Sequence, residues 1–177
     1  FRDEVRAWLE ARGVGRVTDL DWWGSHHPAK DLEVICTPAQ HFTARTPWDR
    51  CRTLWGSFML RTEIGLVFFA GDSGWAPHFG EIQARLGSPR LALLPIGAYE
   101  PRWFMEAVHV TPDQAVRAHL ALGARESIGM HFGTFNLTDE GIDAPLHDLA
   151  AARVTHGVAP ENFHTLDFGE TRTFRAS

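Results

Sequence analysis

The clearest pattern in the chain is a short apolar run at residues 64–70 that ends abruptly in small, turn-forming residues. The run is too short to span a membrane, and its β-branched and aromatic residues favour a buried strand over a surface helix. Gly71, Ser73 and Gly74 follow the run, and Asp72 stands among them. A carboxylate at the end of a buried strand is costly unless a cation meets it. We therefore expect Asp72 to lie near an arginine, a helix N-terminus or a metal ion.

The other apolar positions follow either a helical or an extended period along the chain. The pattern predicts helices at residues 2–12, 79–86, 111–122 and 145–156, and strands at residues 17–23, 32–37, 52–61, 64–70, 91–96, 127–130, 163–168 and 171–174. It predicts a polar turn at residues 25–28 and loops at residues 39–50 and 97–105. Thr111, Pro112 and Asp113 form a strong helix start: a cap residue, a proline at the first helical position and an acid in the first turn. Paired strands followed by alternating strands and helices indicate a mixed α/β layered fold.

Composition narrows the class of protein without choosing a function. The 177 residues predict one domain or a large part of one, and 44% hydrophobic and 22% charged residues are typical of a globular protein. The net charge of -5 argues against nucleic acid as a partner. Two cysteines provide no disulfide framework, and we predict both to be reduced and buried. Together with the lack of a membrane-length apolar run, this composition predicts a cytoplasmic location.

Three polar residues share one kind of position, just beyond a predicted strand. His41 follows the strand at residues 32–37, Asp72 follows the apolar run, and His131 follows the strand at residues 127–130. Loops that leave strand ends in layered α/β folds gather on one rim and carry function. Imidazole and carboxylate are the usual ligands of zinc and related ions, so these residues are candidate metal ligands. The alternative is a capping aspartate and two hydrogen-bonded histidines, because the spacing along the chain is long.

The local contexts of these residues carry a family resemblance. The segments concerned are Leu20-Asp21-Trp22-Trp23, Thr37-Pro38-Ala39-Gln40-His41-Phe42, Phe68-Phe69-Ala70-Gly71-Asp72-Ser73-Gly74, Pro95-Ile96-Gly97-Ala98-Tyr99-Glu100-Pro101-Arg102-Trp103-Phe104-Met105 and Met130-His131-Phe132-Gly133-Thr134-Phe135. Together they resemble the metallo-β-lactamase-fold hydrolases, and more closely the branch that contains the N-acyl-phosphatidylethanolamine-hydrolysing phospholipase D. The resemblance runs from about residue 14 to residue 174.

The resemblance implies an αββα four-layer sandwich with two zinc ions. Asp72 would bridge the two ions, His41 would complete the ligands of one, and His131 those of the other. The family's earlier His-x-His-x-Asp-His motif is not in this chain, and His26 and His27 have the wrong spacing, so we expect these two in a surface turn. Residues 1–177 are therefore expected to be the C-terminal part of one hydrolase domain whose first strands are missing. We expect the intact parent protein to be the enzyme and this chain alone to be metal-poor.

The reaction implied is hydrolysis of a lipid phosphodiester of the N-acyl-phosphatidylethanolamine type by a hydroxide that bridges the metals. Asp72 and His109 are the candidate catalytic residues, with His109 as a donor to the phosphate or the leaving group. Tyr99, Arg102 and Trp103 are candidate substrate-binding residues. Structural alternatives stay open: His109 and Tyr99 as packed loop residues, and Arg102 as the partner of Glu100.

Other substrates and partners remain open at this point. The same fold hosts hydrolases of lactones and nucleotide diesters, and an inactive fragment without metal is a third alternative. The substrate is expected to be a small molecule or a lipid, with peripheral membrane contact and a homodimer as further options. The tryptophans bear on the membrane question, because they either belong to the core or line a lipid-facing rim. Those concerned are Trp22, Trp23, Trp48, Trp75 and Trp103.

Overall fold

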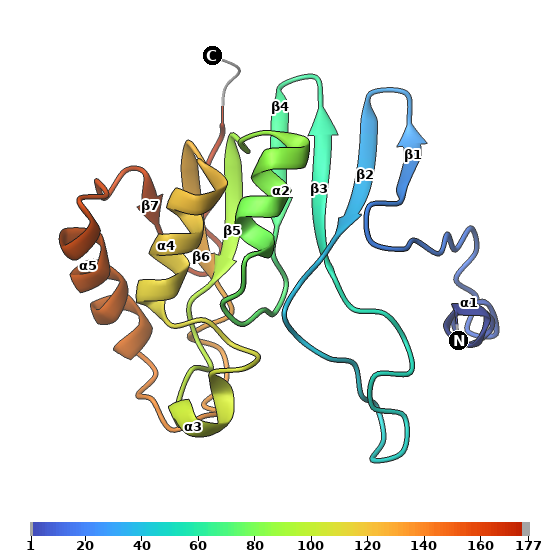
Figure 1. The fold of residues 1–177 in the computed structure, drawn as a ribbon, viewed down its shortest axis with the longest axis horizontal. Coiled ribbons are helices and arrows are strands. Elements are labelled where there is room, and N and C mark those ends of the chain that lie inside the picture. Colours follow the sequence, from blue (N-terminus) through green and yellow to red (C-terminus); the bar gives the residue numbers. More distant parts are fainter. Residues whose placement is uncertain (1, 175–177) are drawn as a thin grey trace.

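A computed structural model describes residues 2–174 of the chain, with side chains from residue 5 onward. It contains a seven-stranded sheet whose strands follow one another in sequence order (Figure 1). The strands are β1 (Ser25–Ala29), β2 (Leu32–Thr37), β3 (Ser57–Thr62), β4 (Gly65–Phe69), β5 (Leu91–Pro95), β6 (Glu126–Met130) and β7 (Phe163–His164). The helices are α1 (Arg2–Glu10), α2 (His78–Leu86), α3 (Arg102–Met105), α4 (Pro112–Leu122) and α5 (Ala144–His156). The expected mixed α/β architecture is confirmed.

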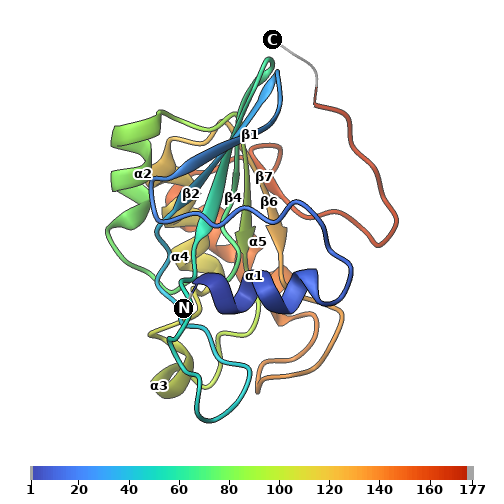
Figure 2. The same ribbon diagram turned by 90° about the vertical axis from the view of Figure 1, so that its right-hand side faces the viewer.

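The sheet has an antiparallel half and a parallel half. Strands β1 to β4 pair antiparallel, and β4 to β7 pair parallel. The parallel strands β4 to β7 are joined through α2, α4 and α5. Each connection adds the next strand on the same side of the previous one. Right-handed crossovers of this kind place their helices on the same face of the sheet. Figures 1 and 2 show α2 and α4 on one face of the sheet, and α4 packs against both α2 and α5. Helix α1 lies apart from this layer, beyond β1.

The core lies between the sheet and the helical layer. Met59 and Phe68 are directly opposite each other on β3 and β4, and both are fully buried. Phe79 of α2 meets the Phe68 ring edge to face at 6.4 Å between centroids. Helix α4 starts as expected, because the Thr111 side chain accepts a hydrogen bond from the Gln114 N–H and the Gln114 side chain accepts one from the Thr111 N–H. The contact between Phe68 and Phe79 holds α2 against the sheet, and the cap determines where α4 begins.

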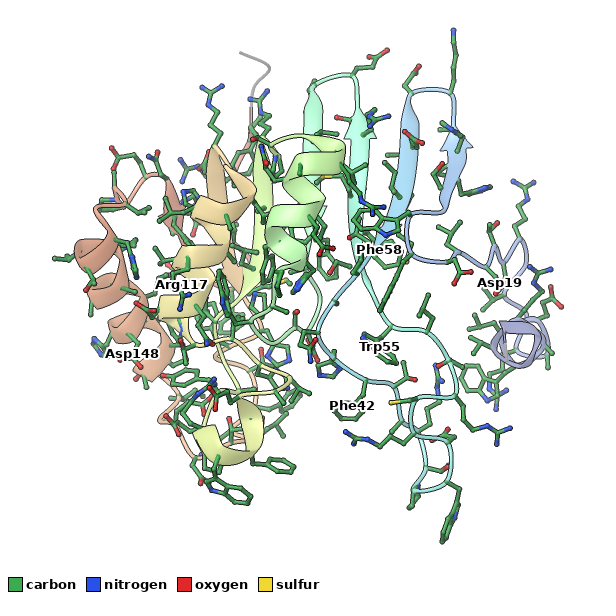
Figure 3. The ribbon with its side chains drawn as sticks, in the orientation of Figure 1. Asp19, Phe42, Trp55, Phe58, Arg117 and Asp148 are labelled. Carbon is green, nitrogen blue, oxygen red and sulfur yellow. The ribbon has the colours of Figure 1, made fainter. Side chains whose placement is uncertain are left out.

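The opposite face of the sheet is apolar and only partly covered. Phe58 and Phe69 face each other across β3 and β4 and are half-exposed, and Figure 3 shows Phe58 on this part of the sheet. In a four-layer sandwich, a second sheet packs on such a face. That second sheet is not among residues 2–174.

The largest error in the sequence-based expectation concerns the first strand. Residues 17–23 were expected to be a strand but have irregular backbone, and the expected polar turn at residues 25–28 belongs to β1. Both edges of β2 are taken, by β1 on one side and β3 on the other, so residues 17–23 form no ladder with β2, although the Trp23 N–H donates to the Cys36 carbonyl at 2.6 Å. All five residues of β1 are exposed, which explains its polar composition. Pro28 fits there because β1 is an edge strand with an irregular register.

Smaller corrections concern strand lengths and one cysteine. Residues 52–56 are loop, because Pro38 ends β2 and the pairing of β2 with β3 therefore begins at Thr37 and Ser57. Strand β7 covers two residues instead of residues 163–168, and residues 171–174 form no strand. The expected loop at residues 97–105 contains the single turn α3. Cys51 is exposed, which contradicts its predicted burial, whereas Cys36 is buried as expected.

Candidate metal centre

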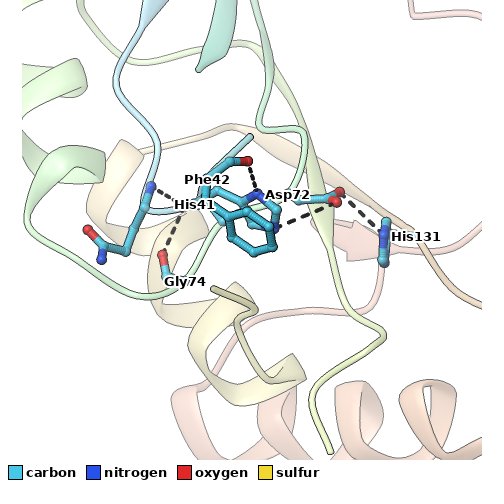
Figure 4. A network of polar contacts seen from close by, with 7 residues as sticks. His41, Phe42, Asp72, Gly74 and His131 are labelled. Carbon is cyan, nitrogen blue, oxygen red and sulfur yellow. Dashed lines mark hydrogen bonds and ion pairs between the residues drawn. The ribbon is translucent and has the colours of Figure 1, made fainter. Parts of the chain in front are cut away.

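The candidate ligands meet because their strands run in the same direction. Strands β2, β4 and β6 share one orientation, since two antiparallel steps separate β2 from β4 and β4 to β6 are parallel. Their carboxyl ends therefore lie at one edge of the sheet. His41, Asp72 and His131 leave these three ends and gather at that edge (Figure 4).

Asp72 lies between the two histidines. Its Oδ1 is 3.3 Å from His131 Nε2, and its Oδ2 is 4.0 Å from His41 Nε2. Each carboxylate oxygen thus faces a different imidazole, as Figure 4 shows. Asp72 was expected to lie near an arginine, a helix N-terminus or a metal ion. The ion-pair contacts described for Asp72 are with His41 and His131, and none of them is with an arginine or a helix N-terminus. The arrangement suits a carboxylate that is shared between two positive centres.

The His41 ring is set up to accept a cation. Its Nδ1 lies 2.8 Å from the Phe42 carbonyl oxygen, which only accepts, so Nδ1 carries the proton and donates it. In the tautomer with the proton on Nδ1, the lone pair lies on Nε2, which is buried and has no hydrogen-bond partner. This lone pair and the Asp72 carboxylate face each other, and both are acceptors. A divalent cation between them would satisfy both, so the residues present fit a metal ion.

His109 belongs to the same cluster. It precedes the Thr111 cap of α4, is buried, and its ring meets those of His41 and His131 at centroid distances of 5.3 and 5.4 Å. Donor atoms of His41, Asp72 and His109 all lie within 4.8 Å of one another. Burial lowers the pKa of His109 to about 4, so its ring is neutral and can donate a lone pair at neutral pH. Sequence reasoning gave His109 the role of a donor to substrate, and the structure makes it a candidate ligand as well.

His131 and Asp72 lie within ion-pair distance of each other, with 3.3 Å between Nε2 and Oδ1. The hydrogen bond to Asp72 raises the pKa of His131, and the same contact lowers the pKa of Asp72. A proton on His131 Nε2 and a metal ion would occupy the same position beside Oδ1. Metal binding at this position therefore releases that proton.

Ser73 joins the three loops that carry these residues. Its hydroxyl accepts a hydrogen bond from the Gln40 N–H at 3.0 Å, and its carbonyl accepts one from the Val110 N–H at 2.9 Å. The Gly74 N–H donates in turn to the Gln40 carbonyl at 2.8 Å. Gln40, Ser73 and Val110 are the chain neighbours of His41, Asp72 and His109. Ser73 is fully buried and holds the three loops in register, although its sequence suggested only a turn.

His78 supports Ser73 from the start of α2. Its Nε2 lies 3.2 Å from the Ser73 hydroxyl, and it is buried. Burial lowers the pKa of His78 to about 4, so the ring is neutral at pH 7. The sequence contained no signal for this role, because it depends on the folded contact between His78 and the Ser73 hydroxyl.

Gly97 is required where β5 approaches the His131 turn. A Cβ at Gly97 would lie 2.3 Å from the His131 carbonyl oxygen, closer than packing allows. His131 itself has a left-handed backbone with φ of 62°. The close contact at Gly97 therefore helps to fix the direction in which His131 leaves β6.

The candidate substrate-binding residues do not join this cluster directly. The Tyr99 hydroxyl donates a hydrogen bond to the Asp148 carboxylate on α5 at 2.5 Å. The pKa of Tyr99 is raised mainly by burial and secondly by this hydrogen bond. The Arg102 guanidinium donates to the carbonyls of Tyr99 and His109, both at 3.1 Å, so it positions the His109 loop. Trp103 is 84% exposed on α3. Roles for these residues in substrate binding remain predictions.

Known proteins resemble the chain over most of its length. A family model described as Beta-lactamase superfamily domain matches residues 2–132. The chain is 37% identical to N-acyl-phosphatidylethanolamine-hydrolyzing phospholipase D 1 of Caenorhabditis elegans, over 94% of the chain and 50% of that protein. It is 35% identical to the mitochondrial N-acyl-phosphatidylethanolamine-hydrolyzing phospholipase D of Saccharomyces cerevisiae, over 82% of the chain and 32% of that protein. The chain thus spans half or less of the length of these two relatives.

The fold also matches a solved structure. Igni18, a metallo hydrolase from the archaeon Ignicoccus hospitalis, superposes with a TM-score of 0.72 at 23% sequence identity. The match covers 97% of this chain and 66% of that one. At this identity the likeness establishes the fold, which is that of the metallo-β-lactamases.

Proposed function

Because this chain belongs to the Beta-lactamase superfamily domain family, we propose that it carries ligands of the metal centre of a zinc-dependent phosphodiesterase. The observation that carries the proposal is the buried, unpartnered Nε2 of His41 facing the Asp72 carboxylate. His109 and His131 complete a set of three imidazoles and one carboxylate. Such donors favour zinc over magnesium or calcium, which prefer oxygen ligands.

Each residue has a separate task in this proposal. Zinc, when bound, lowers the pKa of water and polarises a phosphoryl oxygen. Asp72 holds negative charge between the histidines and keeps both in place, because its two oxygens face different rings. His41 is held in one tautomer by its bond to the Phe42 carbonyl. His109 is neutral, so one ring nitrogen can act as a ligand and the other can donate a hydrogen bond to a phosphoryl or leaving-group oxygen.

The lipid substrate is suggested by the relatives and by the rim of the site. Two relatives are named as enzymes that hydrolyse N-acyl-phosphatidylethanolamine. Trp48 and Trp103 are 87% and 84% exposed, on the loop after β2 and on α3. Both segments extend beyond the end of the sheet where the metal site lies, in both views (Figures 1 and 2). Exposed tryptophans of this kind favour the interface of a membrane, and we propose peripheral contact there.

A substrate panel with the full-length natural protein tests the proposal. Loaded with zinc, the protein should release phosphatidic acid from an N-acylated phosphatidylethanolamine. Asp72→Ala should abolish turnover, whereas Asp31→Ala should leave it unchanged, because Asp31 lies in the exposed turn between β1 and β2. Turnover of a lactone or a nucleotide diester without lipid hydrolysis would favour the other hydrolase class. Normal activity of the Asp72→Ala variant would refute the role given to this carboxylate.

Membrane contact has its own test. No helix within residues 2–174 is long and apolar enough to cross a membrane. We expect the protein to sediment with phosphatidylethanolamine vesicles. The double variant with Trp48→Ser and Trp103→Ser should bind these vesicles more weakly. Substitution of Val154, which is equally exposed on α5, serves as the control. Equal binding by both variants would contradict a role for the rim.

A further inference from the structure

Glu140 holds the loop that follows β5, directly beside the His131 turn. Its Oε1 accepts a hydrogen bond from the Ala98 N–H at 2.6 Å, and its Oε2 accepts one from the Glu100 N–H at 3.1 Å. Both carboxylate oxygens are therefore used to fix this loop. Ala98 has a left-handed backbone with φ of 62°, which is unfavourable for a residue other than glycine and needs such support.

The carboxyl group of Glu140 is ionised in this position. Burial acts to raise the pKa of Glu140, but hydrogen bonds from the Thr138 side chain and from the backbone outweigh it and leave the pKa below its ordinary value. The Ala98 N–H thus donates to a charged acceptor, and such bonds are about twice as strong as bonds between neutral groups. The negative charge of Glu140 therefore lies at the N–H side of the peptide that joins Gly97 to Ala98.

The carbonyl side of the same peptide contacts the His131 ring. The pKa of His131 is raised mainly by its bond to Asp72 and further by a hydrogen bond with the Gly97 backbone. A bond that favours the protonated ring is one that the ring donates, so the acceptor is the Gly97 carbonyl. Because Nε2 faces Asp72, the donor is Nδ1. Glu140 and His131 are thus joined through one peptide group, which carries the Ala98 N–H on one side and the Gly97 carbonyl on the other.

We propose that Glu140 is a positioning residue for the metal ligand His131 and acts through the peptide between Gly97 and Ala98. The inference rests on the proposed function, because it takes His131 as a zinc ligand. A carboxylate on the N–H of a peptide polarises that peptide, and its carbonyl becomes a stronger acceptor. The His131 ring then keeps its proton on Nδ1 and directs the lone pair of Nε2 towards a metal ion. Histidine ligands are usually oriented by a carboxylate or a carbonyl on the second ring nitrogen, and here the two groups act in series.

Zinc binding by the full-length natural protein tests the role of Glu140. Glu140→Gln keeps the size of the side chain, removes its charge and offers one acceptor oxygen in place of two. In competition with a chromogenic chelator, we expect one of the two zinc ions to bind at least tenfold more weakly. Loss of a group that orients a metal ligand typically weakens metal binding by about 10–100-fold. Asp139→Asn removes the same charge from an exposed neighbour in the loop and should leave zinc affinity unchanged.

A proton resonance separates this role from general support of the loop. In the zinc-loaded protein, the His131 Nδ1–H should give a downfield signal in nitrogen-edited NMR, and this signal should move upfield in Glu140→Gln. Asp148→Ala is the structural control, because it removes the acceptor of the Tyr99 hydroxyl, a second tie of the same loop. We expect both variants to fold and to lower the free energy of unfolding in urea. Zinc affinity and the Nδ1–H signal should change only in Glu140→Gln.

The failure of this role can be told apart from the failure of the proposed function. If wild type binds zinc but does not hydrolyse bis(4-nitrophenyl) phosphate or N-acylated phosphatidylethanolamine, and Glu140→Gln behaves as stated, the proposed function fails and the role of Glu140 stands. Zinc affinity of Glu140→Gln equal to that of Asp139→Asn, or an unmoved Nδ1–H signal, would overturn the role of Glu140. A full-length wild type that binds no zinc would overturn both.

Discussion

Replacing Ser73 by alanine tests how the metal site is held together. The substitution removes the acceptor of the Gln40 N–H and the contact with His78 Nε2. A buried donor without its acceptor costs about 1–3 kcal/mol, so the free energy of unfolding should fall by about that amount. The loops that carry His41 and Asp72 also lose a direct connection. Loss of groups that orient metal ligands typically weakens metal binding by about 10–100-fold.

Ser127→Ala is the matched control for this experiment. Ser127 is also fully buried, and its hydroxyl lies 2.8 Å from His119 Nδ1. It stands on β6 about 13 Å along the strand from His131, at about 3.3 Å per residue. We expect urea unfolding in the presence of chelator to show a similar loss of stability for both variants. Zinc affinity, measured by competition with a chromogenic chelator, should fall only in Ser73→Ala. Equal zinc affinity in the two variants would refute the reasoning.

Two further predictions concern stability and the placement of His131. The pKa of His78 is about 4 in the folded protein and near 6.5 in the unfolded chain. As the pH falls, the unfolded chain therefore binds a proton on His78 before the folded protein does. The free energy of unfolding then falls as the pH drops from 6.5 towards 4. At pH 5 this amounts to about 2 kcal/mol, and His78→Gln should reduce the loss between pH 7 and pH 5 by about that amount in urea unfolding; an unchanged loss would contradict the assignment. Gly97→Ala should displace the His131 turn and weaken zinc binding, whereas Gly80→Ala, which has open space, should not; equal zinc affinities would show that the turn adapts.

The parallel half of the sheet could be predicted from the sequence because its signals are local. The apolar runs of β4 and β5 and the Thr111 cap of α4 each depend on neighbouring residues, and all were placed nearly correctly. Strand β1 was missed because its side chains are exposed and polar. An edge strand is defined by its partner, here β2, and not by its own hydrophobic pattern.

The candidate site was only partly visible in the sequence. His41, Asp72 and His131 were candidates because each follows a predicted strand and lies in a segment that resembles the metallo-β-lactamase-fold hydrolases, and the structure brings them together. Ser73 and His78 were not recognised, because their roles depend on contacts between separate loops. Sequence position alone contains no information on the 3.0 Å bond between the Gln40 N–H and the Ser73 hydroxyl.

Zinc binding by wild type and Asp72→Ala tests the central claim most directly. In equilibrium dialysis of the full-length natural protein, we predict two zinc ions bound by wild type and a strong loss of zinc by Asp72→Ala. The Asp31→Ala variant should bind zinc as wild type does. Full zinc occupancy with unchanged affinity in Asp72→Ala would contradict the claim that this carboxylate joins the two halves of the metal centre.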